Sequence, residues 1–256
     1  SPDAVCVSTA ASTAATAVHR IKQSLGDVVA MNRNFYGVLR VREHGGVERT
    51  LMHGSIMHGE QYLARDRRRE PTSYYSETSG VGRLLSALDD RRLVVGLIGL
   101  GAGTLAAYGK PGDTYRFYEI DPAVVDAARR HFSFLADSPA RVDVRIGDGR
   151  LLLQAEPPRS FDVLVIDAFT GDSIPVHLLT REALVLYAAR IKPQGVIALH
   201  ISNRHLDLRP VAGRLAAELG LQLAYVADPE SDTDPDKVSS DWILLARDRS
   251  ILDLPH

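Results

Sequence analysis

The sequence predicts an α/β protein in which a small β-rich domain precedes a Rossmann-like domain, and three observations lead to this fold class. Residues 93–98 form a continuous apolar run, as expected for a strand buried in a parallel sheet. Strand and helix patterns then alternate along the chain, which is typical of parallel strands covered by helices. Strand and turn patterns dominate before this region. We therefore expect domains at residues 1–76 and 77–256.

The first domain should contain three short strands. Residues 34–41 have strand composition, residues 43–46 read as a turn, and residues 49–53 read as the returning strand of a hairpin. A further strand is expected over 60–63, and a helix over 14–29. The basic run at 65–69 has no interleaved aromatic side chains, and we interpret it as a solvated loop.

The second domain should contain five parallel strands, expected at 93–98, 115–120, 142–146, 161–166 and 196–201. Helices are expected between and after them, at 123–134, 150–154, 180–191 and 210–219. Two last strands, 221–226 and 242–246, are joined by an acidic loop. Five parallel strands followed by a terminal hairpin are the strands of a Rossmann-like sheet of the class I methyltransferase type.

Composition narrows the class of protein. The 256 residues suffice for a substantial core, and a formal net charge of -2 gives no reason to expect a nucleic-acid partner. The lone cysteine, Cys6, excludes an internal disulfide and suits a reducing compartment. No apolar stretch reaches the length of a membrane span, so we expect a cytoplasmic protein. Because the sequence starts with Ser1, a membrane segment upstream of it stays open.

A glycine loop directly follows the first strand of the second domain. Gly99, Gly101 and Gly103 let the backbone turn tightly and bring free amides close to a ligand. A glycine loop alone does not distinguish a ligand-binding loop from an ordinary turn between a strand and a helix.

Acidic residues at the ends of the next strands sharpen this interpretation. Glu119 stands where a carboxylate accepts the ribose hydroxyls of an adenosine, whereas Asp121 is expected to cap the following helix. Asp148, before Gly149, is placed either to accept a hydrogen bond from the adenine amine or to cap a helix. Asp167 follows a further strand, at the edge of the sheet where ligands bind. The dinucleotide fingerprint is incomplete, so we expect an S-adenosyl nucleotide rather than NAD.

The sequence resembles the spermidine synthases, or polyamine aminopropyltransferases, and within them the bacterial spermidine-synthase-like proteins. The resemblance extends over residues 34–247. The stretches that carry it are HGEQYL, PTSYYSETSGVG, GLGAGT, YEIDP, GDGR and VIDAFTGDSIPVHLLTREA. It implies a transferase that moves an aminopropyl group from decarboxylated S-adenosylmethionine to a small amine, with methylthioadenosine as the leaving group.

The resemblance also implies roles for individual residues. Gln61 should lie near the nucleoside, Glu119 on the ribose, and Asp148 with Gly149 at the adenine. Asp167 matches the acidic residue that holds or deprotonates the attacking amine. Either Tyr74 or Tyr75 should stand beside it. A homodimer is expected from the resemblance alone.

Two positions depart from the family pattern. The family places an Asp where this chain has Ala102, and that Asp contacts the donor's ammonium group. It places a second Asp where this chain has Thr170; Asp172 is nearby but out of register. These departures keep open an S-adenosylmethionine-dependent methyltransferase, or another sulfonium-substituent transferase, and a catalytically idle nucleotide-binding module.

Further polar residues lie near the expected ligand edge. Ser202 and Asn203 follow the fifth parallel strand, where they either contact substrate or bond the next loop. The spacing of His53, His58 and His200 matches no zinc pattern, so we expect no metal.

Overall fold

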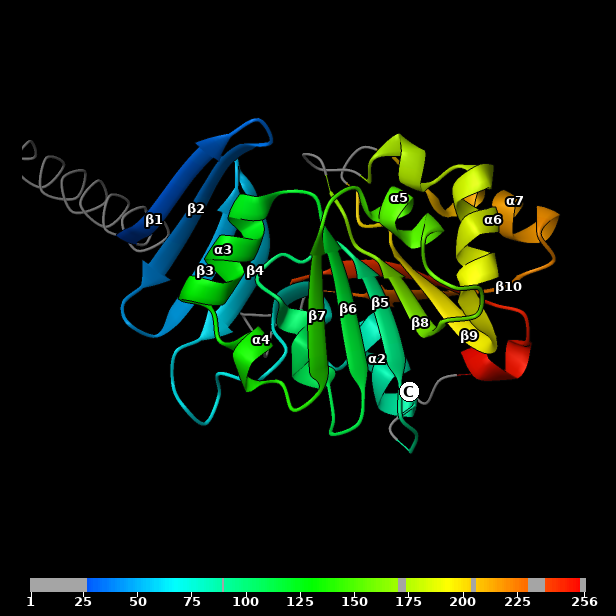
Figure 1. Cartoon of the computed structure of the whole chain (residues 1–256), viewed down its shortest axis with the longest axis horizontal. Helices are drawn as coiled ribbons and strands as arrows, with labels where there is room; N and C mark the ends of the chain where they lie inside the picture. Colours follow the sequence, from blue (N-terminus) through cyan, green and yellow to red (C-terminus); the bar gives the residue numbers. More distant parts are fainter. Residues whose placement is uncertain (1–26, 89, 170–173, 204–205, 230–237, 254–256) are drawn as a thin grey trace, which may run out of the picture.

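The computed structural model describes residues 27–88, 90–169, 174–203, 206–229 and 238–253. It contains a four-stranded and a seven-stranded sheet (Figure 1). The small sheet is antiparallel and follows chain order: β1 (Asp27–Asn34), β2 (Gly37–His44), β3 (Glu48–His53) and β4 (Ile56–Tyr62).

The start of this sheet corrects two predictions. The helix expected over 14–29 is wrong at its end, because residues 27–29 belong to β1; residues 14–26 lie outside the described part of the chain. The strand expected over 34–41 is interrupted at its start by a turn. The Asn34 side chain accepts a hydrogen bond from the Tyr36 N–H at 2.9 Å, and Gly37 has a φ of +131°. This Asx turn outweighs the strand composition of Phe35 and Tyr36.

The large sheet has the order β10-β11-β9-β8-β5-β6-β7. Its strands are β5 (Val94–Ile98), β6 (Thr114–Glu119), β7 (Arg141–Ile146), β8 (Phe161–Ile166), β9 (Ile191–His200), β10 (Gln222–Asp228) and β11 (Ser240–Ala246). The first five are mutually parallel, and β11 and β10 add an antiparallel hairpin to one edge. The predicted fold class is confirmed.

Helices cover both faces of the large sheet. The α-helices are α2 (Gly80–Ala87), α3 (Pro122–His131), α4 (Phe134–Asp137), α5 (Gly149–Gln154), α6 (Arg181–Arg190) and α7 (Arg209–Glu218). Short 3-10 helices are η1 (Ser73–Tyr75), η2 (Thr104–Tyr108), η3 (Val176–Leu178) and η4 (Arg249–Leu252). The helix expected over 123–134 is divided between α3 and α4, because the Gln61 side-chain carbonyl accepts the Ser133 N–H at 2.9 Å and Phe132 is extended.

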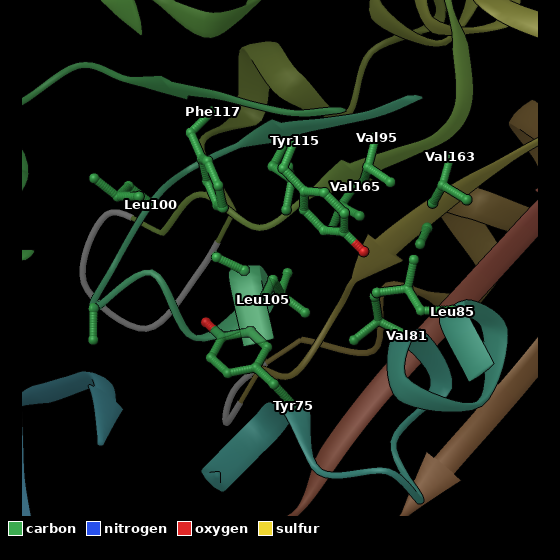
Figure 2. Packing of buried hydrophobic residues seen from close by; sticks show 14 of the residues in the cluster. Tyr75, Val81, Leu85, Val95, Leu100, Leu105, Tyr115, Phe117, Val163 and Val165 are labelled. Carbon is green, nitrogen blue, oxygen red and sulfur yellow. The ribbon is translucent and has the colours of Figure 1, made fainter. Parts of the chain in front are cut away.

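Alternate residues along each central strand enter two different apolar clusters, as a strand buried on both faces requires. Val163 and Val165 of β8 pack with α2 and α3, whereas Leu164 and Ile166 pack with α5, α6 and α7. Figure 2 shows part of the first cluster, in which Tyr75 lies near Leu105. In the described residues, no helix is long and apolar enough to cross a membrane.

Candidate active site

The glycine loop after β5 is held close to two neighbouring strands. A Cβ atom on Gly99, whose φ is +102°, would lie 2.1 Å from the backbone oxygen of Asp167. A Cβ atom on Gly101, whose φ is +53°, would lie 2.2 Å from the backbone oxygen of His58. Glycine is therefore required here because it allows both the backbone conformation and the close approach. The loop thus packs between the end of β8 and β4.

Glu119 ends β6 and faces this loop. Its carboxylate accepts the backbone N–H groups of Leu100 at 3.0 Å and Asp121 at 2.9 Å, and the residue is only 8% exposed. Burial raises the pKa of Glu119 to about 7, although these hydrogen bonds favour the ionised form. Asp121 accepts the Ala123 N–H and caps α3, as predicted.

The larger of two cavities, about 530 Å³, lies over the glycine loop and the ends of β5, β6 and β8. Glu119, Asp148 and Gly149 line it, together with the β1–β2 turn from Phe35 to Val38. Asp148 also caps α5 by accepting the Leu151 N–H at 2.9 Å. Both sequence interpretations of Asp148 are therefore compatible with its position.

A second cavity, about 330 Å³, adjoins the first. Both tyrosines of η1 line it, as do Asp167, Ser202, Asn203 and Asp241. The residues that line both cavities are Ile56, His58, Gly101, Asp167 and Phe169. The two cavities therefore meet at the end of β8, and Asp167 stands at their junction.

Both carboxylate oxygens of Asp167 have partners. The Tyr75 hydroxyl donates to Oδ2 at 2.7 Å, and His200 Nδ1 lies 2.7 Å from Oδ1. Burial raises the pKa of the Tyr75 hydroxyl, and the charge of Asp167 raises it further. Tyr74 lines the smaller cavity, and its ring centroid lies 5.5 Å from that of His200. Of the two tyrosines, Tyr75 makes the hydrogen bond to Asp167.

Two contacts hold the segment that carries Tyr75. The side chains of Ser76 and Thr78 each donate to Asp228 Oδ2 at 3.1 Å, which fixes the segment after η1 to the end of β10. The Tyr108 hydroxyl donates to the Tyr75 backbone oxygen at 2.6 Å. The position of Tyr75 therefore depends on two separate elements, β10 and η2.

His58 is a neutral aromatic group at the junction of the cavities. The pKa of His58 is lowered to about 4, chiefly by burial and also by the nearby His53, while Asp167 opposes the shift. The two histidine rings lie 5.6 Å apart. Among the described residues, no three His, Cys, Asp or Glu side chains gather as a metal would require.

Several predicted site residues lie elsewhere or outside the described part. Gln61 lines neither cavity: its side-chain amide donates to the Arg68 backbone oxygen at 2.8 Å and to Ser133 Oγ at 2.9 Å. It braces β4 against α4. Thr170 and Asp172 lie outside the described residues.

Ala102 is buried against β4 rather than exposed to a cavity. A Cβ atom on Gly59 would lie 2.6 Å from the Ala102 side chain, and the Ala102 N–H donates to the His58 backbone oxygen at 3.0 Å. An aspartate at this position would therefore have to displace β4.

Sequence reasoning missed two members of the site. His200 was considered only as a metal ligand, and Asp241 only as part of an acidic loop. The available signal was position: both residues lie on neighbouring strands β9 and β11 at the ligand-binding edge, where Asp241 donates its N–H to Ser202 Oγ at 2.9 Å. Asn203 accepts the Leu206 N–H and also lines the smaller cavity.

No protein-family model matches the chain. The polyamine aminopropyltransferase of Vibrio vulnificus (strain CMCP6) is 31% identical over 125 residues, or 48% of this chain and 41% of that protein. A probable polyamine aminopropyl transferase of Bifidobacterium longum is 26% identical over 172 residues, or 66% of this chain and 36% of that protein.

A methyltransferase is also similar. The N-terminal histidine N-methyltransferase of Emericella nidulans is 38% identical over 116 residues, or 43% of this chain and 20% of that protein. The chain thus matches less than half the length of each of these curated relatives.

The solved structures define the class of fold first. Human methyltransferase-like protein 13, in complex with SAH, has a TM-score of 0.50 at 18% identity, over 69% of this chain and 90% of that one. This likeness places the large sheet among methyltransferase-like folds.

The particular resemblance is to spermidine synthases. A probable spermidine synthase from Corynebacterium glutamicum has a TM-score of 0.69 at 19% identity, over 86% of this chain and 80% of that one. A spermidine synthase in complex with the transition state analogue AdoDATO has a TM-score of 0.61 at 16% identity, over 86% of this chain and 72% of that one. With the curated relatives, these matches confirm the resemblance predicted from the sequence motifs.

Proposed function

We propose that the protein transfers an aminopropyl group from decarboxylated S-adenosylmethionine to a small amine. The observation that carries this proposal is the position of Asp167 at the junction of two cavities, one suited to a nucleoside and one to a cation. A transfer reaction needs the donor and the acceptor to meet beside a group that receives a proton.

The nucleoside half of the proposal rests on the larger cavity. The ionised Glu119 carboxylate has lone pairs for the ribose hydroxyls besides those used by Leu100 and Asp121. Asp148 lies where it can accept the adenine amine. The complexes of two structural neighbours with AdoDATO and with SAH support an S-adenosyl ligand.

The amine half rests on the charges of the smaller cavity. Asp167 and Asp241 both line it, and no lysine or arginine stands among the described residues that line either cavity. The neutral imidazole of His58 adds no positive charge at the junction. Such a cavity favours a cationic acceptor.

The chemistry follows from this arrangement. The acceptor's unprotonated nitrogen attacks the propyl carbon beside the sulfonium, so that a C–N bond forms while the C–S bond breaks. The electron pair of the broken bond goes to sulfur, and methylthioadenosine leaves. The new ammonium then loses a proton, and we assign its acceptance to Asp167, which lines both cavities.

Methyl transfer from intact S-adenosylmethionine is the second candidate. Two points favour it: the resemblance implies an aspartate for the donor's ammonium at position 102, where this chain has an Ala buried against β4, and one relative is a histidine N-methyltransferase. An idle nucleotide-binding module is the third candidate, and the retained Asp167–Tyr75 contact argues against it.

Calorimetry separates these candidates. We expect decarboxylated S-adenosylmethionine and methylthioadenosine to bind, with intact S-adenosylmethionine at least tenfold weaker. Chromatography should then detect methylthioadenosine release only when an amine such as putrescine, cadaverine, spermidine or agmatine is added. Tighter binding of intact S-adenosylmethionine would favour methyl transfer, and a lack of binding by all three would refute the nucleoside site.

A further inference from the structure

We propose that His200 is a positioning residue that holds the Asp167 carboxylate for the acceptor amine by donating a hydrogen bond from Nδ1. This inference rests on the proposed function for its kinetic consequence, whereas its structural part stands on hydrogen bonds alone. The residues involved form a chain from β11 through β9 to β8 and η1.

The hydrogen bonds determine where the proton lies. Ser202 Oγ accepts the Asp241 backbone N–H at 2.9 Å and lies 2.9 Å from His200 Nε2. His200 Nδ1 lies 2.7 Å from Asp167 Oδ1, and an ionised carboxylate only accepts. Nδ1 therefore carries a proton, which it donates to Asp167, and the Ser202 hydroxyl is the partner of Nε2.

Aromatic packing holds the imidazole plane. The Trp242 ring stacks on His200 with centroids 4.4 Å apart and planes inclined by 7°. Phe169 meets the imidazole edge-on at 4.9 Å. His200 is 2% exposed and Trp242 is fully buried, so rotation of the imidazole would require neighbouring side chains to move.

The consequence is a carboxylate fixed from both sides. Tyr75 donates to one oxygen of Asp167 and His200 to the other, so the carboxylate cannot turn about its Cβ–Cγ bond without losing a bond. Each oxygen keeps a further lone pair, and Asp167 lines both cavities. His200 also lines the smaller cavity, and its role in this proposal is to direct these lone pairs.

The order Asp–His–Ser is also that of nucleophilic triads. In this protein the Ser202 hydroxyl oxygen accepts the Asp241 backbone N–H, and the role of Ser202 is to hold the imidazole in place at Nε2. Covalent labelling of Ser202 by a fluorophosphonate probe would contradict this role.

The decisive experiment compares His200→Asn with His200→Leu. Both side chains have similar size and both lose the stacked ring, but Asn keeps an N–H donor near the place of Nδ1. We expect kcat of His200→Leu to fall at least about tenfold below that of His200→Asn, the effect of one hydrogen bond to a charged group. The KM for the nucleoside should stay within about threefold in both. Equal kcat values would reduce His200 to a packing role and overturn the proposal.

A second readout does not depend on turnover. In protein labelled with ¹⁵N-histidine, the ring resonances of His200, assigned by their loss in His200→Asn, should show a protonated Nδ1. If the wild type shows no amine-dependent turnover but Nδ1 is protonated, the proposed function fails while the structural assignment holds. A ring whose Nδ1 carries no proton would overturn the assignment whatever the activity.

Discussion

At the scale of single residues, the site combines a carboxylic acid that burial makes hard to ionise with an imidazole that burial makes hard to protonate. The pKa of Glu119 is raised to about 7, and that of His58 is lowered to about 4. Their effects on stability have opposite signs. The raised pKa of Glu119 lowers stability as pH rises from its ordinary value of 4.5 through 7, whereas the lowered pKa of His58 removes stability as pH falls from 6.5 towards 4.

We predict that nucleoside affinity rises with pH. Only the ionised form of Glu119 accepts both ribose hydroxyls, and its population grows as pH increases from 5.5 to 8. Calorimetry with methylthioadenosine over this range measures the effect. Glu119→Gln should weaken binding at pH 8 by about tenfold or more and remove the pH dependence. A 2′,3′-dideoxy analogue, which lacks the hydroxyls, serves as the control. An equally steep profile for this analogue would show that another group titrates.

Sequence reasoning reached some of these residues and missed others for a physical reason. Glu119 and Asp167 follow buried parallel strands, and the ends of such strands meet at one edge, so their type and place predicted a ligand site. The partners of Asp167 come from segments 92 residues before it and 33 residues after it. Spacing along the chain does not encode such side-chain meetings, and so the choice between Tyr74 and Tyr75 required the structure.

At the scale of elements, the glycine loop is a point of contact between strands as well as a candidate cradle for the nucleoside. Its backbone lies directly against the end of β8 and against His58 of β4, so its shape and the position of Asp167 depend on one another. The elements themselves were predictable where one pattern dominates. The continuous apolar runs of β5 and β8 predicted buried strands, whereas the Asx turn at Asn34 and the break after α3 depend on single side-chain hydrogen bonds.

We predict that Gly99→Ala disrupts both cavities. The added methyl group would lie 2.1 Å from a backbone oxygen at a φ of +102°, so the loop or β8 must move. We expect a loss of about 2 kcal/mol or more in the free energy of unfolding, together with loss of nucleoside binding. Gly45→Ala is the matched control, because Gly45 has a φ of +59° with open space around it. Gly45→Ala should lower the free energy of unfolding by about 1–2 kcal/mol and leave nucleoside binding unchanged. Normal nucleoside affinity in Gly99→Ala would contradict the role of the loop.

At the scale of the whole molecule, the two sheets share one apolar cluster. Leu39, Val41 and Leu51 of the small sheet belong to the same cluster as Trp242 of the large sheet. The small sheet also contributes the β1–β2 turn to the larger cavity. The boundary at residue 76 and a homodimer stay predictions, and this shared core indicates that the two sheets depend on one another for stability.

We predict that a destabilising substitution in the small sheet also lowers the stability of the large sheet. Leu51→Ala removes a fully buried side chain and should lower the free energy of unfolding by about 2–5 kcal/mol. Trp242, the only tryptophan, reports on the large sheet through its fluorescence during urea unfolding. We expect its transition to shift together with the far-UV circular dichroism. Val47→Ala, at an exposed position, should leave both almost unchanged. A Trp242 transition that does not move in Leu51→Ala would show that the two sheets unfold independently.

The most direct test of the proposed activity is the mass of the product formed by the wild type and by Asp167→Asn. With decarboxylated S-adenosylmethionine and a diamine, we predict that the wild type yields an amine heavier by one aminopropyl group. Asp167→Asn should reduce its formation at least about a hundredfold while nucleoside affinity stays within a few fold, because Asp167 faces the acceptor and Glu119 holds the ribose. A product heavier by one methyl group, or nearly full activity in the variant, would contradict the account.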